Sequence, residues 1–262
     1  MIAHHTLTGP EDAPVLVLGN ALGTTTELWN DFSLPFRLLR FDHRGHGGSA
    51  PVPGPCEIED LARDVVELLD HLGLRQVHYC GVSLGGMVGM WLAAHTDRIS
   101  RLALVSTTAW LPDKKRLDDR IALLRSRGME PAADAIVERW FTPGCAPDVV
   151  ARFRAGLLEV DLPSYLACAE AVRRMDLRPD LAKIDVPTVV IAAAQDRATP
   201  TELVRHTAEE LPDSELYVVG DAAHLAVVEA PRTISVILDD HFGNDQAWCR
   251  ATSRALPLPD RG

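Results

Sequence analysis

Cysteine is scarce in this chain, and its five cysteines are scattered and odd in number. No two of them have the CxxC spacing of a zinc site or a redox motif. Small secreted proteins held together by disulfides carry even, closely spaced sets instead. The pattern argues against a disulfide framework and against a zinc site. It favours isolated thiols in a reducing compartment such as the cytoplasm.

Long hydrophobic runs are missing too. No apolar stretch approaches the roughly 20 residues that a helix needs to span a bilayer. Residues 1–10 show no basic segment followed by an apolar run, so no secretory signal is indicated. We therefore expect a cytoplasmic protein that does not bind a membrane.

Basic residues are fewer than acidic ones, so the formal net charge is −11 at pH 7. An acidic surface disfavours general binding to nucleic acid or to anionic lipid, although a single pocket can still be basic. The 262 residues are 47% hydrophobic and 24% charged. That composition is typical of a folded globular protein with one large domain or two small ones.

The chain does contain a regular alternation of apolar runs and helical patterns. From Ile58 to Leu72, apolar residues recur three or four positions apart, which predicts an amphipathic helix. Other patterns predict helices over 84–94 and 231–242, and strands over 14–18, 37–41, 77–80, 102–105, 187–193 and 216–219. Strands alternating with helices predict an α/β fold, with a mostly parallel sheet flanked by helices.

The segment 112–179 breaks this alternation, because it holds helical patterns and no convincing strand. Such an insertion predicts a helical cap over the carboxyl ends of the strands, where α/β folds place their ligands. The expected organisation is a core domain of residues 1–111 and 180–243, a cap of residues 112–179, and a loosely ordered tail of residues 244–262.

The sharpest motif is Gly81-Val82-Ser83-Leu84-Gly85. Its spacing alone arises by chance in unrelated chains, but here it lies between a predicted strand and a predicted helix, the setting of a nucleophile elbow. Such a tight turn strains the serine backbone and projects its hydroxyl, while the glycines let neighbouring backbones pass closely. Ser83 is therefore the candidate catalytic nucleophile.

A serine nucleophile needs a base and an acid that orients the base, and enzymes with this elbow carry them in the order serine, acid, histidine. Asp196 and His224 each follow a predicted strand, so both are expected at the same sheet edge as Ser83. Asp221 is the alternative acid. The other histidines fit less well: we expect surface exposure for His71, His95 and His241, and a mobile terminus for His4 and His5.

Ester hydrolysis also needs backbone N–H donors for the oxyanion of the tetrahedral intermediate. Leu84 directly follows the nucleophile and is the first candidate. The second donor is expected in the loop Asn20-Ala21-Leu22-Gly23 after the first predicted strand, where Leu22 is the candidate.

The segment from Asp42 to Ser49 has the composition of a metal or phosphate site, with histidines, an aspartate and glycines. Its two histidines are only three residues apart, and no further ligands have useful spacing. The pattern favours a structural turn. No metal or phosphate site is expected in this segment.

Together these motifs are similar to those of the bacterial 3-oxoadipate enol-lactonases, within the α/β-hydrolase fold. The resemblance covers residues 9–242 and includes the segment 138–143, Glu-Arg-Trp-Phe-Thr-Pro, which lies in the predicted cap and is the most diagnostic. It also rests on residues 20–24 with Trp29, 195–200, and 222–225 with Glu229 and Pro231.

The resemblance implies a hydrolase that cleaves a small anionic enol lactone to 3-oxoadipate, without cofactor or metal. Ser83, deprotonated by His224, would attack the lactone carbonyl. The carboxylate arm of the substrate needs a cation or hydrogen-bond donors, and Arg139 and Trp140 are the candidates. We expect a solvated helix face, at most steering anions, from the basic residues Lys114, Lys115, Arg116, Arg120, Arg125 and Arg127.

Departures from the family pattern concern the substrate: Ala21 replaces a usual serine, Val227 replaces a usual polar residue, and Ala193 and Ala194 replace a common glycine and threonine. A less polar substrate, and hence a related carboxylesterase or a cofactor-free perhydrolase, is the alternative. Ligand receptors on this fold usually lack a catalytic residue, and none is missing here. A haloalkane dehalogenase would need aspartate at position 83. No feature of the sequence indicates a particular oligomeric state.

Overall fold

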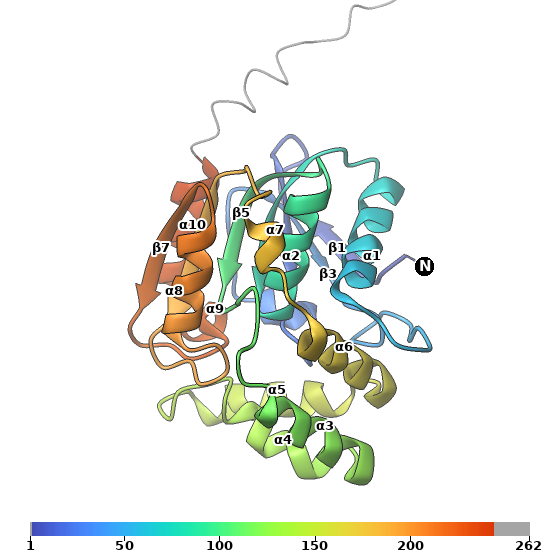
Figure 1. Ribbon diagram of the computed structural model, residues 1–262. Helices are drawn as coiled ribbons and strands as arrows, with labels where there is room; N and C mark the ends of the chain where they lie inside the picture. Colours follow the sequence, from blue (N-terminus) through green and yellow to red (C-terminus); the bar gives the residue numbers. More distant parts are fainter. Residues whose placement is uncertain (1, 244–262) are drawn as a thin grey trace, which may run out of the picture.

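A seven-stranded sheet lies at the centre of the protein (Figure 1). The computed structural model describes residues 2–243, and its strands are arranged in the order β1-β3-β2-β4-β5-β6-β7. The bounds are β1 His5–Thr8, β2 Val15–Gly19, β3 Arg37–Phe41, β4 Val77–Val82, β5 Ile99–Val105, β6 Thr188–Ala193 and β7 Ser214–Val219. Within the described part, β1 alone is antiparallel to its neighbour. The predicted mostly parallel α/β fold is confirmed.

Burial explains why the inner strands were visible in the sequence. Every residue of β2, β4 and β6 is buried, because helices cover both faces of the inner strands and leave no polar side to alternate. The expected tail of residues 244–262, which includes Cys249, lies outside the described residues.

The strand β1 corrects an expectation about the amino terminus. His4 and His5 were expected at a mobile end, but His5 pairs with Phe41 in the sheet, and His4 Nδ1 lies 2.8 Å from Asp42 Oδ2. The four residues of β1 alternate between half-buried and exposed positions, as an edge strand does. So short and polar a segment carries no apolar signal, and only its partner strand identifies it.

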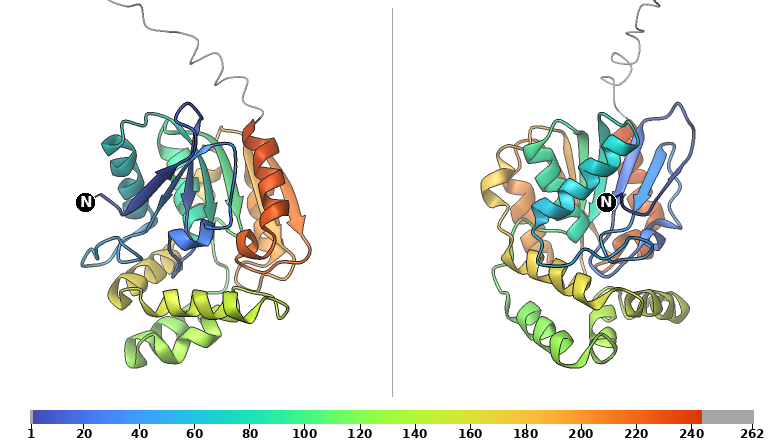
Figure 2. Two further views of the ribbon diagram at one scale, coloured as in Figure 1. Left: turned by 180° about the vertical axis from the view of Figure 1, so that it is seen from behind. Right: turned by 90° about the vertical axis from the view of Figure 1, so that its right-hand side faces the viewer.

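Helices cover both faces of the sheet (Figures 1 and 2). One face carries α1 (Ile58–His71), α2 (Leu84–His95), α7 (Arg178–Leu181) and α8 (Thr201–Glu210). The other face carries α10 (Pro231–Gly243), whose Phe242 ring stacks on His78 of β4 at a centroid distance of 5.2 Å. His241 was expected on the surface, but it is half-buried, and burial lowers its pKa to about 4.

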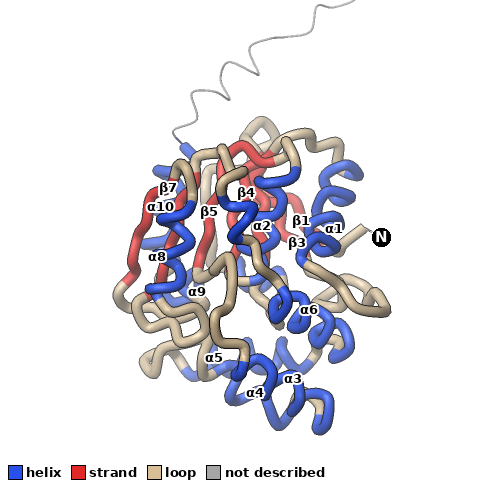
Figure 3. The backbone as a smooth tube through the Cα atoms, viewed as in Figure 1, coloured by secondary structure: helices blue, strands red, loops and turns tan. Residues whose placement is uncertain are grey.

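Four further helices lie across the carboxyl ends of the strands, and we call them the cap helices (Figures 1 and 2). They are α3 (Lys115–Arg127), α4 (Glu130–Val137), α5 (Pro147–Leu158) and α6 (Leu162–Arg174), and they connect β5 to β6. α3 packs on α4 and α6, and α4 packs on α5. Loops occupy the layer between the sheet and these helices (Figure 3), together with the short helices η1 (Thr26–Trp29) and α9 (Ala226–Glu229).

Candidate active site

Ser83 occupies a strained turn between β4 and α2. Its backbone has φ 53° and ψ −113°, in a region that residues other than glycine rarely adopt. Three hydrogen bonds hold this geometry: its N–H donates to Val105 O at 2.9 Å, and its carbonyl accepts from Met87 N at 3.0 Å and Thr107 Oγ1 at 2.8 Å. Strain retained by such bonding is typical of functional residues.

The glycines around Ser83 are required by close backbone contacts. A Cβ atom at Gly81 would lie 2.3 Å from the carbonyl carbon and oxygen of Gly85. A Cβ atom at Gly85 would lie 2.4 Å from Gly19 O, in the neighbouring strand β2. Both distances are far below van der Waals contact, so the elbow can form only without side chains at these positions.

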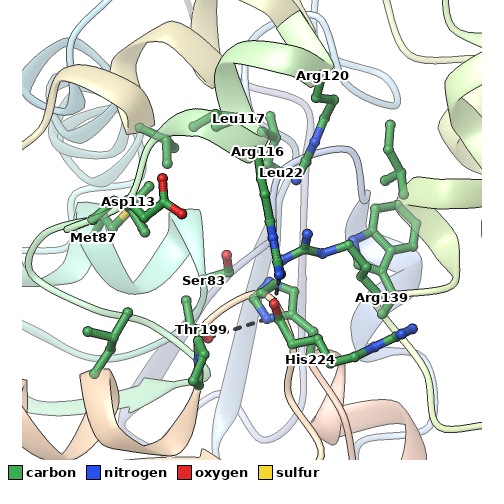
Figure 4. A pocket seen from close by; sticks show the side chains of 18 of the residues that line it. Leu22, Ser83, Met87, Asp113, Arg116, Leu117, Arg120, Arg139, Thr199 and His224 are labelled. Atoms are coloured by element: carbon green, nitrogen blue, oxygen red, sulfur yellow. Dashed lines mark hydrogen bonds between the residues drawn. The ribbon is translucent and has the colours of Figure 1, made fainter.

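Asp196 and His224 form a hydrogen-bonded pair, with His224 Nδ1 2.8 Å from Asp196 Oδ2. Both side chains are buried, whereas the alternative acid Asp221 is exposed. Because Nδ1 is engaged with the carboxylate, the other ring nitrogen, Nε2, is left to accept a proton. His224 and Ser83 line the same cavity (Figure 4).

Asp196 is held as an anion by several donors. Its Oδ1 accepts the N–H groups of Ala198 and Thr199, and its Oδ2 accepts the Thr199 hydroxyl at 2.7 Å. Burial by itself raises the pKa of this carboxyl, but the charge of His224 and the hydrogen bonds from His224 and Thr199 outweigh burial and lower the pKa below its ordinary value. The pair is therefore stabilised with Asp196 ionised.

Thr199 is a contributor that the sequence analysis missed. Besides its bonds to Asp196, its hydroxyl lies 3.5 Å from His224 Nδ1 (dashed in Figure 4). The sequence did indicate a turn at this point. An aspartate commonly accepts a hydrogen bond from the N–H two residues further on, as Asp196 does from Ala198. Recognising that turn would have placed Thr199 against the carboxylate.

Hydrogen bonds hold the loop that carries Leu22 directly against the nucleophile elbow. Asn20 O accepts the N–H of Gly85 at 3.0 Å and lies 3.1 Å from His43 Nε2. The N–H of Gly23 donates to His46 Nε2 at 3.2 Å, so it is not free to bind a ligand. Leu22 itself lines the cavity beside Ser83. Leu84 is the first residue of α2, where N–H groups have no acceptor within the helix.

The Asp42–Ser49 segment forms a turn that ties several loops together. Asp42 accepts hydrogen bonds from the N–H groups of Thr26 and Gly48, and its carbonyl accepts the Ser49 hydroxyl. Burial and the neighbouring His46 lower the pKa of His43 to about 3, so this histidine is neutral. Residues 2–243 contain no cluster of three or more histidine, cysteine or acidic side chains that could hold a metal ion.

Arg139 (Figure 4) and Trp140 both line the cavity. The cavity has a volume of about 320 Å³. Trp140 is buried, and its carbonyl accepts the N–H of Leu225, the residue after His224, at 2.9 Å. The Glu229 carboxylate joins the same two segments, because it accepts Thr142 N and Ala223 N, both at 2.8 Å. The segment from 138 to 143 is thus bound directly to the loop that carries His224.

The basic part of the cap departs from expectation in one respect. Arg116 and Arg120 were expected on a solvated helix face, and Arg116 is exposed and Arg120 half-buried, but both also line the cavity with Arg139 and Arg197. Their spacing of four places them on one side of α3, which was the available signal. Which side of α3 faces the cavity depends on how the helix packs, and that packing cannot be predicted from the local sequence pattern.

Ala21 and Val227 do not have the role expected of them. Both are buried at 1% exposure, and neither belongs to the residues that line the cavity. The polarity of the cavity is set by its arginines instead.

Comparison with known proteins agrees with this geometry. A family model of the alpha/beta hydrolase fold matches residues 14–144. The chain is also 35% identical over 235 residues to 3-oxoadipate enol-lactonase 2 of Acinetobacter baylyi, which covers 87% of this chain and 88% of that protein. The chain belongs to the α/β-hydrolase family.

Two further members of the family are similar over nearly the whole chain. The crystal structure of the enol-lactonase from Burkholderia xenovorans LB400 has a TM-score of 0.89 at 35% identity, over 92% of this chain and 96% of that one. A RutD protein of Stutzerimonas stutzeri, assigned as a carbamate hydrolase, is 31% identical over 88% of this chain and 92% of its own. The protein is therefore a hydrolase. None of its described helices is both long and apolar enough to cross a bilayer.

Proposed function

We propose that this hydrolase opens an enol lactone carrying a carboxylate arm, 3-oxoadipate enol-lactone, to give 3-oxoadipate. The observation that supports this most directly is the shared cavity, in which Ser83 and His224 meet a wall of arginines that includes Arg139. A catalytic serine beside fixed cations suits an anionic ester or lactone. The similarity to two enol-lactonases supports the same substrate.

In the first half of the reaction, Ser83 Oγ attacks the lactone carbonyl while His224 Nε2 accepts its proton. Asp196 stabilises the resulting imidazolium through the 2.8 Å contact to Nδ1. The N–H groups of Leu22 and Leu84 donate to the oxyanion of the tetrahedral intermediate. The bond from the carbonyl carbon to the ring oxygen then breaks, and His224 Nε2 gives its proton to that oxygen. This leaves an ester on Ser83, an enol as the leaving group and a neutral His224.

In the second half, His224 takes a proton from water, and the hydroxide adds to the ester carbonyl. The intermediate collapses by breaking the bond to Ser83 Oγ, which regains its proton from His224. The product is a carboxylate, and its enol becomes the ketone of 3-oxoadipate. Arg139 and Trp140 hold the carboxylate arm during both halves.

The proposal is tested by steady-state assays with 3-oxoadipate enol-lactone and p-nitrophenyl acetate. We expect a kcat/KM of about 10⁴ M⁻¹s⁻¹ or more for the lactone, the range of natural substrates, and a much lower value for the ester. Weak lactone turnover beside strong ester turnover would replace the lactonase with a carboxylesterase. The likeness to RutD makes a carbamate the third substrate to assay.

Replacing Trp140 by alanine should lower kcat/KM for the lactone about ten-fold, because a wall of the cavity is lost. Trp140→Phe keeps most of that wall and should recover most of the activity. Trp91→Ala is the matched control, since Trp91 stacks on His95 away from the cavity. Unchanged kinetics in a folded Trp140→Ala protein, judged by circular dichroism, would remove Trp140 from the binding site.

A further inference from the structure

Three arginines converge on the cavity from two elements of the cap. Arg116 and Arg120 belong to α3, and Arg139 follows α4. All three line the same cavity as Ser83 and His224, as Figure 4 shows. We call these three residues the arginine cluster.

The arginine cluster differs from other arginines of the cap in its partners. Arg125 pairs with Glu170, and Arg154 pairs with Glu130 and Asp134. Arg120 instead meets the Tyr165 hydroxyl at 3.3 Å, and Arg139 donates to the carbonyl of Arg197. Within residues 2–243, no member of the cluster forms an ion pair with an acidic side chain.

The positive charge of the cavity is therefore only partly compensated. Arg197, a fourth arginine of the lining, is paired with Glu138 at 3.2 Å. Asp113 is the one acidic side chain among the described residues of the lining, and the charge of the buried Asp196 carboxylate also acts on Arg139. Positive charge remains in excess around the cavity, and a bound anion relieves the repulsion between the guanidinium groups.

Arg139 shows this repulsion most clearly. Its Nε atom is buried without a hydrogen-bond partner in the described structure. Burial lowers the pKa of its guanidinium, and the like charges of Arg120 and Arg116 lower the pKa further. A carboxylate in the cavity would satisfy the free donor and offset both effects.

We propose that the cavity is a dicarboxylate site, in which the arginine cluster binds the doubly charged product of lactone hydrolysis more tightly than the singly charged substrate. Hydrolysis turns the neutral lactone group into a carboxylate, so the ligand's charge rises from −1 to −2 while it is still bound. An excess of positive charge attracts a ligand with two negative charges more strongly than a ligand with one. A volume of about 320 Å³ is small for a ligand pocket and suits a short diacid.

The consequence is competitive inhibition by product. This part rests on the proposed function, because it assumes that the reaction generates a diacid. The preference for dicarboxylates does not rest on it, since it depends only on the charges of the cavity.

The probe is adipate, a stable diacid with the chain length of the product, compared with the monoacid hexanoate. In calorimetric titrations of the full chain, we expect adipate to bind at least about ten-fold more tightly, because it makes additional charge-assisted hydrogen bonds. Arg116→Gln and Arg120→Gln should each weaken adipate about ten-fold and hexanoate less. Added salt should reduce the difference in affinity between adipate and hexanoate, because it screens the charges.

Arg127→Gln is the matched control, because Arg127 lies on the same helix but does not line the cavity. It should bind adipate like the unmodified protein. Equal affinity for adipate and hexanoate, or unchanged adipate binding in Arg116→Gln and Arg120→Gln, overturns the dicarboxylate site.

The two proposals fail separately. If the lactone is not turned over but adipate still binds through the arginine cluster, the proposed substrate is wrong and the dicarboxylate site stands. If the lactone is turned over rapidly and adipate neither binds nor competes with it, the proposed function stands and the dicarboxylate site is wrong.

Discussion

Ser83→Ala is expected to lower kcat by about 10⁴- to 10⁶-fold, because no other group on the elbow can form the acyl intermediate. The fold should survive. The hydrogen bonds described for this turn involve the backbone of Ser83 rather than its hydroxyl. Activity and thermal unfolding, measured on the same preparation, check both halves of this expectation.

Ser106→Ala supplies the matched control for Ser83→Ala. Ser106 has a similar backbone, with φ 47°, and it directly follows β5. Its buried hydroxyl has no hydrogen-bond partner in the described structure, and it does not line the cavity. We expect this variant to retain turnover within a few-fold. Retained activity in Ser83→Ala would exclude Ser83 as the nucleophile.

Asp196→Asn is the second large effect, with an expected loss in kcat of about 10³- to 10⁴-fold. An amide cannot stabilise the imidazolium, and its NH₂ group favours the wrong tautomer of His224. The KM should change little, because Asp196 does not line the cavity. A loss below about ten-fold would show that another acid, such as Asp221, orients the histidine.

The same variant should change how stability depends on pH. The pKa of Asp196 is lower in the folded chain than its ordinary value of about 3.9, so its ionised form stabilises the fold above that value. This stabilisation is lost as the pH falls from about 4 through the lowered pKa. Urea unfolding should therefore show the unmodified protein more stable than Asp196→Asn at pH 7, with a gap that narrows in acid. A gap that is constant with pH would contradict the assigned ionisation.

The inner strands of the sheet could be predicted from sequence because they are buried on both faces. A run such as Thr188–Ala193 has to be apolar throughout, and that pattern survives without knowledge of its neighbours. β1 could not be predicted, because its stability comes from pairing with Phe41 and from the contact between His4 and Asp42. Those partners lie more than 30 residues away.

The candidate site also contains parts that could be predicted from sequence and parts that could not. Ser83 could be predicted because the elbow is local, and its glycines are required by contacts within a few residues or with an adjacent strand. The placement of Arg116 and Arg120 depends on the orientation of one cap helix, which local patterns leave open. Ala21 stood out by comparison with a family, yet its buried position gives it no contact with the cavity.

The bonds between the cap and the His224 loop have a consequence for exchanging caps among relatives. Trp140 O receives the N–H of Leu225, and Glu229 joins Thr142 to Ala223. A transplanted cap can lack groups that bond to Leu225 and Glu229. Glu229 would then lose its Thr142 partners, and the His224 loop would no longer be held in position. Chimeras should therefore carry residues 222–229 along with the donor cap, as a single module. A chimera that exchanges only the cap helices would have a new cavity lining, but its catalytic base, His224, would be misaligned.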